Sequence, residues 1–257
     1  MAISGPWIGS QAVSETGKRW AQEQFVAVRL PAAGWYSSLN GRSREVTIYI
    51  NTANHNYNYI DLQNALFAQG TTPVRIEVTQ HLASYSTLVP CFNFPADLQN
   101  EYITLYITSN VMGRGGDGAT AGSRYGKPGG GAISNWIGGR LRIDNRGAIC
   151  GGGGGGEGRS LNSNLTTGGS GGRPLGNGGT GEGRDSVNGN SASYDSPGAS
   201  ARNSRYGQNG GAGGEVGSNG GNSSGNGSGE GAGAAGMAVA GTTPTWINRG
   251  NIYGATV

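Results

Sequence analysis

Apolar residues are concentrated before about residue 112, and their spacing predicts a small set of strands and helices there. Val46–Ile50 alternates with the period of two that is typical of a half-buried strand. Two further apolar runs, 74–79 and 102–108, predict strands of the same kind. Between the first two strands, 60–69 has the length of a short helix and is followed by Gly70. This segment therefore predicts a β-α-β unit with one more strand.

A helix is also predicted upstream of these strands. Ala21, Phe25 and Val28 share one helical face in a segment from about residue 14 to residue 30, and Pro31 follows directly. Together with the β-α-β unit, this helix predicts a small α/β domain over residues 1–112.

From Gly113 onward the hydrophobic pattern is lost and glycine takes its place, with a period of three. Between Gly207 and Gly220, every third position carries a side chain: Asn209, Ala212, Glu215 and Ser218. Polyproline II geometry has three residues per turn and no internal hydrogen bonds. The spacing therefore favours ordered glycine helices over the flexible linker that composition alone suggests.

Such helices must find hydrogen-bond partners in their neighbours, since buried N–H and C=O groups are almost always paired. Glycine permits the close approach that this pairing needs, but there is no strict collagen repeat. We therefore expect residues 113–257 to form a bundle of packed antiparallel polyglycine type II helices with variable connecting loops. The run Gly151–Gly156 carries no side chain and is expected inside the bundle.

A weak internal repeat marks one end of this bundle. Residues 145–151 (NRGAICG) match residues 248–254 (NRGNIYG), and Val111–Gly113 resembles their ends. We expect the three copies to be equivalent rungs at the base of the bundle.

If the glycine segments run alternately out and back from Gly113, the turns at 119–125, 159–166, 184–206 and 237–245 lie at the far end. The turns at 132–150, 173–175 and 221–225 then lie near the base. Residues 184–206 also have room for another helix pair, which would move their middle to the base. Rigidly held loops rich in Tyr, Arg, Ser and Asn are typical of recognition surfaces. The candidate receptor-binding residues are Arg124, Tyr125, Arg159, Leu161, Asn162, Leu165, Tyr194, Asp195, Arg202, Arg205, Tyr206 and Met237.

Charge and motifs exclude several other classes of protein. The net charge of +3 is too small to indicate nucleic acid or an anionic membrane as partner, and the start has no signal-peptide pattern. Gly113–Gly118 fits GxGxxG, but no helix pattern follows it, so we assign no nucleotide site. His55 and His81 lack metal-ligand spacing, and no paired carboxylates or Ser/His/Asp order indicates catalysis. We expect no enzyme activity, cofactor, metal or membrane insertion.

Two features are left with open alternatives. Cys91 and Cys150 permit one disulfide, although buried free thiols are the expectation. The aromatic pairs Trp7-Ile8 and Trp35-Tyr36 fit either core packing or a docking surface for a partner.

Several motifs taken together resemble the receptor-recognising adhesins of T-even-like phages, and the resemblance spans the whole chain. The motifs are Gly5-Pro6-Trp7-Ile8-Gly9-Ser10, Gly41-Arg42-Ser43, Gly113-Arg114-Gly115-Gly116, the segment 137–143 (IGGRLRI), Gly151–Gly156 and Ile252-Tyr253-Gly254-Ala255.

The resemblance implies a monomeric adhesin at the distal end of a long tail fibre in the virion, made in the host cytoplasm. It implies that the N-terminal domain attaches to a trimeric shaft, one adhesin per fibre tip. Variable loops would bind an outer-membrane protein, porin-like, of a Gram-negative host. Candidate attachment residues are Trp7, Ile8, Trp20, Phe25, Trp35 and Tyr36. A fibre-assembly chaperone and an ice-binding polyglycine protein are alternatives, and purified virions that contain the chain would argue against both.

Overall fold

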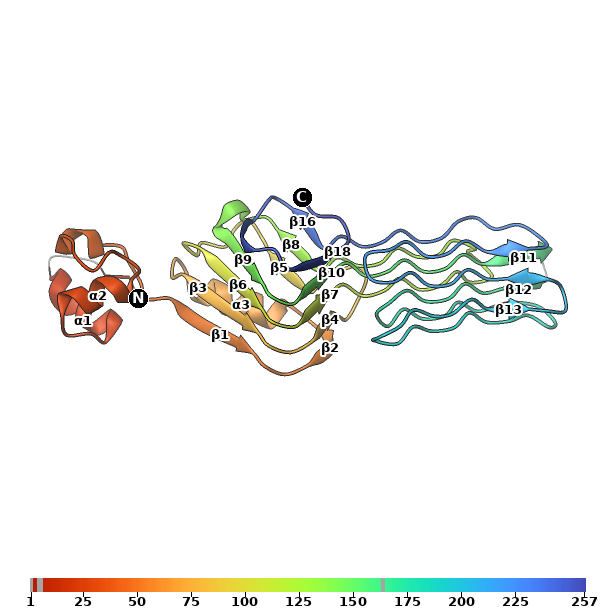
Figure 1. Cartoon of the computed structure of the whole chain (residues 1–257), viewed down its shortest axis with the longest axis horizontal. Coiled ribbons are helices and arrows are strands. Elements are labelled where there is room, and N and C mark those ends of the chain that lie inside the picture. The colour runs from red at the N-terminus through yellow and green to blue at the C-terminus, as the bar shows by residue number, and fades with distance from the viewer. Residues whose placement is uncertain (1, 4–6, 163–164) are drawn as a thin grey trace.

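The structure is a computed structural model that describes residues 2–3, 7–162 and 165–257. Gly5 and Pro6 of the first adhesin-like motif lie outside these residues. Three parts follow one another along the longest axis of the molecule (Figure 1). A small helical domain lies at one end, a stack of parallel strands in the middle and a glycine-rich bundle at the other end.

The first part is helical, with α1 (Ile8–Thr16), α2 (Ala21–Ala27) and the 3-10 helix η1 (Tyr36–Leu39). The prediction of one helix over 14–30 is wrong, because Gly17 adopts a left-handed conformation (φ 67°) and its N–H caps the carbonyl of Val13. The chain turns there and starts a second helix. A small apolar core joins the helices and consists of Ile3, Ala12, Phe25, Val28 and Leu39.

The predicted strands are confirmed, but they belong to the second part of the molecule and not to an N-terminal α/β domain. They are β1 (Val46–Ile50), β3 (Val74–Val78) and β6 (Ile103–Ile107), which pair in parallel and in register, and α3 (Ile60–Ala68) precedes β3. The same sheet continues through β9 (Leu141–Asn145), next to the 3-10 helix η2 (Gly138–Arg140), and ends at β17 (Thr245–Asn248).

A second parallel sheet contains the sequence repeat. Its strands are β2 (Asn54–Tyr57), β4 (Leu82–Ser84), β7 (Asn110–Met112), β10 (Ala148–Cys150) and β18 (Asn251–Tyr253). Ile149 of β10 lies opposite Ile252 of β18 on one side and Val111 of β7 on the other. The prediction that the three copies are equivalent rungs is therefore confirmed.

A third sheet completes the stack with β5 (Phe92–Phe94), β8 (Ile133–Asn135) and β16 (Val239–Gly241). The chain thus winds repeatedly past the three sheets and adds parallel strands to them, and their inward side chains form one apolar core. One glycine-rich segment connects β7 to β8, and a longer one connects β10 to β16. Strands on both sides of the predicted 112/113 boundary therefore share one core.

In the bundle, extended segments alternate with the short strands β11 (Arg159–Asn162), β12 (Leu165–Thr167), β13 (Arg202–Asn203), β14 (Gln208–Asn209) and β15 (Ser224–Gly225). Gly151–Gly156 is buried, as predicted. From Gly152 to Glu157, successive backbone N–H groups donate to backbone carbonyls of three different segments, at 2.7–3.0 Å. The pairs are Gly152 to Gly130, Gly153 to Arg173, Gly154 to Ser218, and then Gly155 to Lys127, Gly156 to Ser170 and Glu157 to Gly221.

These hydrogen bonds also give the directions of the segments. From Gly152 to Gly155, the residue number of the acceptor falls from 130 to 127, so that neighbour runs in the opposite direction. From Gly154 to Glu157, the residue number of the acceptor rises from 218 to 221, so that neighbour runs in the same direction. The central segment therefore has parallel as well as antiparallel neighbours, which corrects the prediction of an antiparallel bundle.

Candidate functional site

The turns of the bundle fall into two groups at its opposite ends. Figure 1 shows β11, β12 and β13 at the end away from the helical domain. β-Bridges link this group, since Ser160 of β11 lies opposite Ser228 and Thr167 of β12 lies opposite Val187. β14 pairs with both β13 and β15, so the turns at 203–208 and near Gly225 lie at the same far end.

The base of the bundle includes a turn at 193–196, as the open alternative for residues 184–206 predicted, and a turn at 215–218 that the sequence did not identify. In the first, the Tyr194 ring stacks on His55 of β2, with centroids 4.0 Å apart. In the second, Gly217 lies against the backbone of Tyr253 in β18. The turn at 215–218 adds one reversal to the predicted path, so the predicted places of 221–225 and 237–245 are exchanged: the former lies at the far end and the latter at the base.

The predicted receptor-binding residues divide accordingly. Tyr194, Asp195 and Met237 lie at the base, so the prediction of a far-end position is wrong for these three. The far end carries the remaining ones: Arg124, Tyr125, Arg159, Leu161, Asn162, Leu165, Arg202, Arg205 and Tyr206. The side chains of Asn162 and Leu165 are outside the described set, although their backbones pair in the β11–β12 hairpin.

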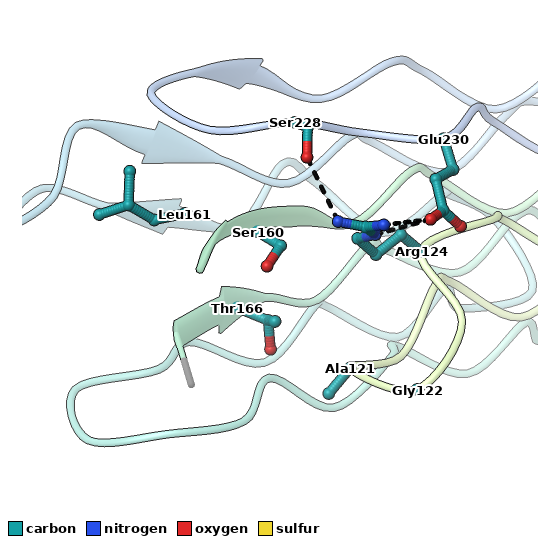
Figure 2. A pocket seen from close by; sticks show the side chains of 8 residues that line it. All are labelled: Ala121, Gly122, Arg124, Ser160, Leu161, Thr166, Ser228 and Glu230. Atoms are coloured by element: carbon teal, nitrogen blue, oxygen red, sulfur yellow. Dashed lines mark hydrogen bonds and ion pairs between the residues drawn. The ribbon is translucent and has the colours of Figure 1, made fainter. Parts of the chain in front are cut away.

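One far-end cluster surrounds Arg124. Its Nε donates to Oε1 of Glu230 at 2.9 Å, its Nη2 also contacts that oxygen, and its Nη1 donates to Oγ of Ser228 at 3.2 Å. Figure 2 shows this guanidinium held between Ser228 and Glu230. The cluster borders a cavity of about 440 Å³, to which the 121–124 turn and the β11–β12 hairpin also contribute.

A buried carboxylate supports this cluster from beneath. Glu157 is the last residue of the central segment, and its Oε2 accepts hydrogen bonds from N–H and Oγ of Ser223 at 2.6 and 2.8 Å. Its Oε1 accepts the N–H of Gly231 at 2.6 Å. Arg159 donates to the carbonyls of Gly225 and Gly227 at 2.6 and 2.7 Å. Arg159 therefore holds a neighbouring turn in place and spends most of its donors within the chain.

A second far-end cluster forms around Asp185. Its Oδ2 accepts Nη1 of Arg205 at 2.7 Å and the hydroxyl of Tyr206 at 3.5 Å. Its backbone carbonyl accepts Nδ2 of Asn203. Asp185 has a left-handed backbone (φ 68°), a conformation that Asp adopts more readily than most residues. The turn at 183–186 thus fixes an arginine and a tyrosine at the surface.

Sequence reasoning missed Glu157, Asp185 and Glu230, which organise the two clusters. The available signal was charge, because each is one of a small number of carboxylates in a Gly/Ser/Asn-rich region that also contains several arginines. Their partners are 20 to more than 100 residues away along the chain, so sequence spacing could not reveal the pairs.

The helical domain presents aromatic side chains to solvent. Trp7, Trp20 and Trp35 are 76%, 71% and 85% exposed, and Tyr36 is also exposed. Ile8 is half-buried against the small apolar core. Phe25 was predicted as an attachment residue, but it is only 2% exposed and belongs to that core, so its side chain is not available to a partner.

Cys91 and Cys150 are buried free thiols. Within the described ranges, no three His, Cys, Asp or Glu side chains gather as metal ligands would. Among the helices of the described chain, none is both long enough and apolar enough to span a bilayer.

Comparison with known proteins identifies the family. The sequence profile described as "Phage tail fibre adhesin Gp38" matches residues 45–257, and that of its N-terminal domain matches residues 1–40. The chain is 46% identical, over 99% of both sequences, to "Receptor-recognizing protein gp38" of Salmonella phage S16. It also resembles a chain in the "Crystal structure of the gp37-gp38 adhesin tip complex of the bacteriophage S16 long tail fiber". The TM-score is 0.82, the sequence identity is 43%, and both chains are covered in full. The chain therefore belongs to the Gp38 family of phage tail fibre adhesins.

Proposed function

We propose that this adhesin lies at the tip of a long tail fibre and binds an outer-membrane protein of a Gram-negative host through the far-end turns of its bundle. The observation that carries the proposal is the arrangement in Figure 1: the turns and the aromatic helical domain lie at opposite ends of an elongated molecule. One end can therefore attach to the fibre while the other reaches the cell. The family is one of adhesins and not of enzymes.

The bundle serves as a rigid scaffold of polyglycine type II helices in this proposal. Support comes from the backbone N–H groups of Gly152–Glu157. Consecutive N–H groups donate to three different neighbouring segments in turn, and the same three segments recur every three residues. That recurrence is the period of polyproline II geometry. Cross-linking in three directions stiffens the bundle and holds its turns in fixed places.

The helical domain is the attachment site for the trimeric shaft. Helices α1, α2 and η1 each begin directly after a tryptophan, at Trp7, Trp20 and Trp35. Large exposed aromatic side chains are typical anchors of protein interfaces. A three-fold shaft offers three equivalent surfaces to one adhesin, and three similarly placed tryptophans provide one anchor for each. The S16 relative was crystallised in a gp37-gp38 complex, which fits this proposal.

The test is adsorption of purified, labelled protein to host cells with and without individual outer-membrane porins. The test variant is the double replacement Arg205→Ser/Tyr206→Ser, which removes an exposed guanidinium and a half-buried phenol from a far-end turn. Asp195→Ser is the matched control, because this exposed residue lies in a turn at the base. We expect the double variant to lose adsorption, the control to keep it, and both to bind the shaft protein.

Equal adsorption by the double variant and the wild type would contradict a receptor site in this turn. Adsorption that no porin deletion affects would contradict a porin as the receptor. Loss of shaft binding together with adsorption would show that the two ends are not independent.

A further inference from the structure

We infer that the cavity beside Arg124 and Glu230 binds the carboxamide of an Asn or Gln side chain from an extracellular loop of the receptor protein. This inference rests on the proposed function and deepens it, because it names the chemistry that one part of the far end recognises. It concerns a single cavity, so it can fail while the proposed receptor surface stands.

The cavity lies where three turns meet. Ala121 and Gly122 form one wall, Leu161 and Thr166 of the β11–β12 hairpin form another, and Glu230 with Arg124 closes the side between them (Figure 2). Its volume of about 440 Å³ is ample for one side chain or a short stretch of backbone. Because the three turns are joined by hydrogen bonds, the cavity exists before any ligand arrives.

Hydrogen-bond accounting shows which groups remain for a ligand. A guanidinium has five N–H donors, and Arg124 uses Nε, one N–H of Nη2 and one of Nη1 within the chain. Two N–H donors therefore have no acceptor among the described residues. Both bonds to Glu230 end on Oε1, and no described residue donates to its Oε2. The ion pair thus presents free donors beside a free acceptor.

The charge of the pair selects among ligands. Arg124 and Glu230 neutralise each other, so an ammonium or a carboxylate gains little here and loses its hydration. The primary carboxamide of an Asn or Gln side chain is neutral and carries an N–H donor and a C=O acceptor side by side, so its N–H fits Oε2 of Glu230 and its C=O fits the remaining N–H groups of Arg124. Hydrogen bonds to charged groups are also stronger than those between neutral groups.

The other walls favour a protein ligand over a sugar. Leu161 is 42% exposed and offers an aliphatic surface for the stem of an Asn or Gln side chain. Among the described residues that line the cavity, none has an aromatic ring on which the face of a sugar could stack. Thr166 already bonds with Glu182 and Ser228 with Arg124, so few hydroxyls remain for a sugar.

The test fills the cavity without touching the ion pair. A Cβ on Gly122 would meet no atom within 4 Å, and its backbone is outside the left-handed region, so Gly122→Phe can fold and place its ring in the cavity. Gly122→Ala is the matched control, because it makes the same backbone change without filling the space. Leu161→Ser is a second variant that removes the aliphatic wall. The probes are host cells and detergent-solubilised, immobilised outer-membrane protein of the host.

We expect Gly122→Phe to slow adsorption to cells and to weaken binding to the solubilised protein at least tenfold. Gly122→Ala should stay within about twofold of wild type, and Leu161→Ser should fall between them. Thermal midpoints within 2 °C of wild type would show that the variants fold.

Three results would overturn the inference. In the first, Gly122→Phe binds like wild type while Arg205→Ser/Tyr206→Ser does not, which leaves the proposed function standing. In the second, Gly122→Ala is as defective as Gly122→Phe. In the third, Gly122→Phe loses adsorption to cells but keeps binding to solubilised protein, which would indicate a glycan in the cavity. If neither Gly122→Phe nor the Arg205/Tyr206 variant changes adsorption, the proposed function fails as well.

Discussion

Replacing Gly154 by alanine should destabilise the bundle far more than a single methyl group normally does. Gly154 lies in the middle of the buried run Gly151–Gly156. A Cβ added there would lie 1.9 Å from the carbonyl oxygen of Gly233 and 2.8 Å from the N of Gly220. Ordinary contact begins at 3.4 Å, so the neighbouring backbone must move by about 1.5 Å. Backbone cannot turn away as a flexible side chain would.

The magnitude follows from what that movement breaks. The contact region contains the hydrogen bonds from Gly154 to Ser218, from Gly214 to Gly154 and from Gly220 to Gly233. Each contributes about 0.5 to 1.5 kcal/mol net, and overpacking costs a further 1 to 3 kcal/mol or so. Alanine recovers only about 0.4 to 1 kcal/mol through the unfolded state. We therefore expect a loss of roughly 3 to 5 kcal/mol in the free energy of unfolding.

Differential scanning calorimetry measures this loss directly. For a domain of this size, 1 kcal/mol corresponds to a shift of roughly 2–4 °C, so Gly154→Ala should lower the midpoint by roughly 6 to 20 °C. Gly122→Ala is again the control and should shift it by less than about 2 °C, because its Cβ meets nothing within 4 Å. A midpoint for Gly154→Ala equal to that of Gly122→Ala would refute close packing in the centre of the bundle.

Three other predictions concern the far end, the base and the helical domain. Glu157→Gln puts an NH₂ group against N–H or O–H donors from Ser223 or Gly231. The free energy of unfolding should therefore fall by about 1.5 to 3 kcal/mol. An unchanged midpoint in calorimetry would contradict this prediction. Burial raises the pKa of Cys150 to about 12. The folded state therefore keeps a thiol proton that the unfolded state releases from about pH 9 upward. Because the unfolded state then binds fewer protons, the free energy of unfolding should fall between about pH 9 and 12. Thermal scans of Cys150→Ala should show a shallower fall, and equal slopes would refute this. Trp35→Ala should keep the wild-type midpoint but weaken shaft binding in a pull-down, since the ring is 85% exposed; full shaft binding would count against the aromatic anchors.

Features that depend on local chemistry could be predicted from the sequence. The strands at Val46–Ile50 and near residues 74 and 103 follow from period-two apolar runs. The rungs at 111, 149 and 252 were visible because strands in equivalent positions of a stack face the same neighbours and keep similar residues. The buried place of Gly151–Gly156 follows from its lack of side chains.

The number of turns in the bundle could not be predicted, because a glycine chain reverses with little local signal. The base turns at 193–196 and 215–218 are set by tertiary contacts, such as Tyr194 on His55. Missing the turn at 215–218 placed Met237 at the wrong end. Tyr194 and Asp195 were assigned to the far end, although the alternative left open for 184–206 puts them at the base.

The sequence by itself thus determined which segments are strands, which glycines are buried and, through its motifs, the family. Only the tertiary structure decided which turns share the far end and which charges pair there. β8 and β16 are neighbours although about 100 residues separate them, and Arg124 meets Glu230 across a similar separation. Backbone hydrogen bonds between segments determine which residues become neighbours. Because every glycine offers the same N–H and C=O, the local sequence does not specify the partner of each group, and the pairing depends on how the whole chain is arranged.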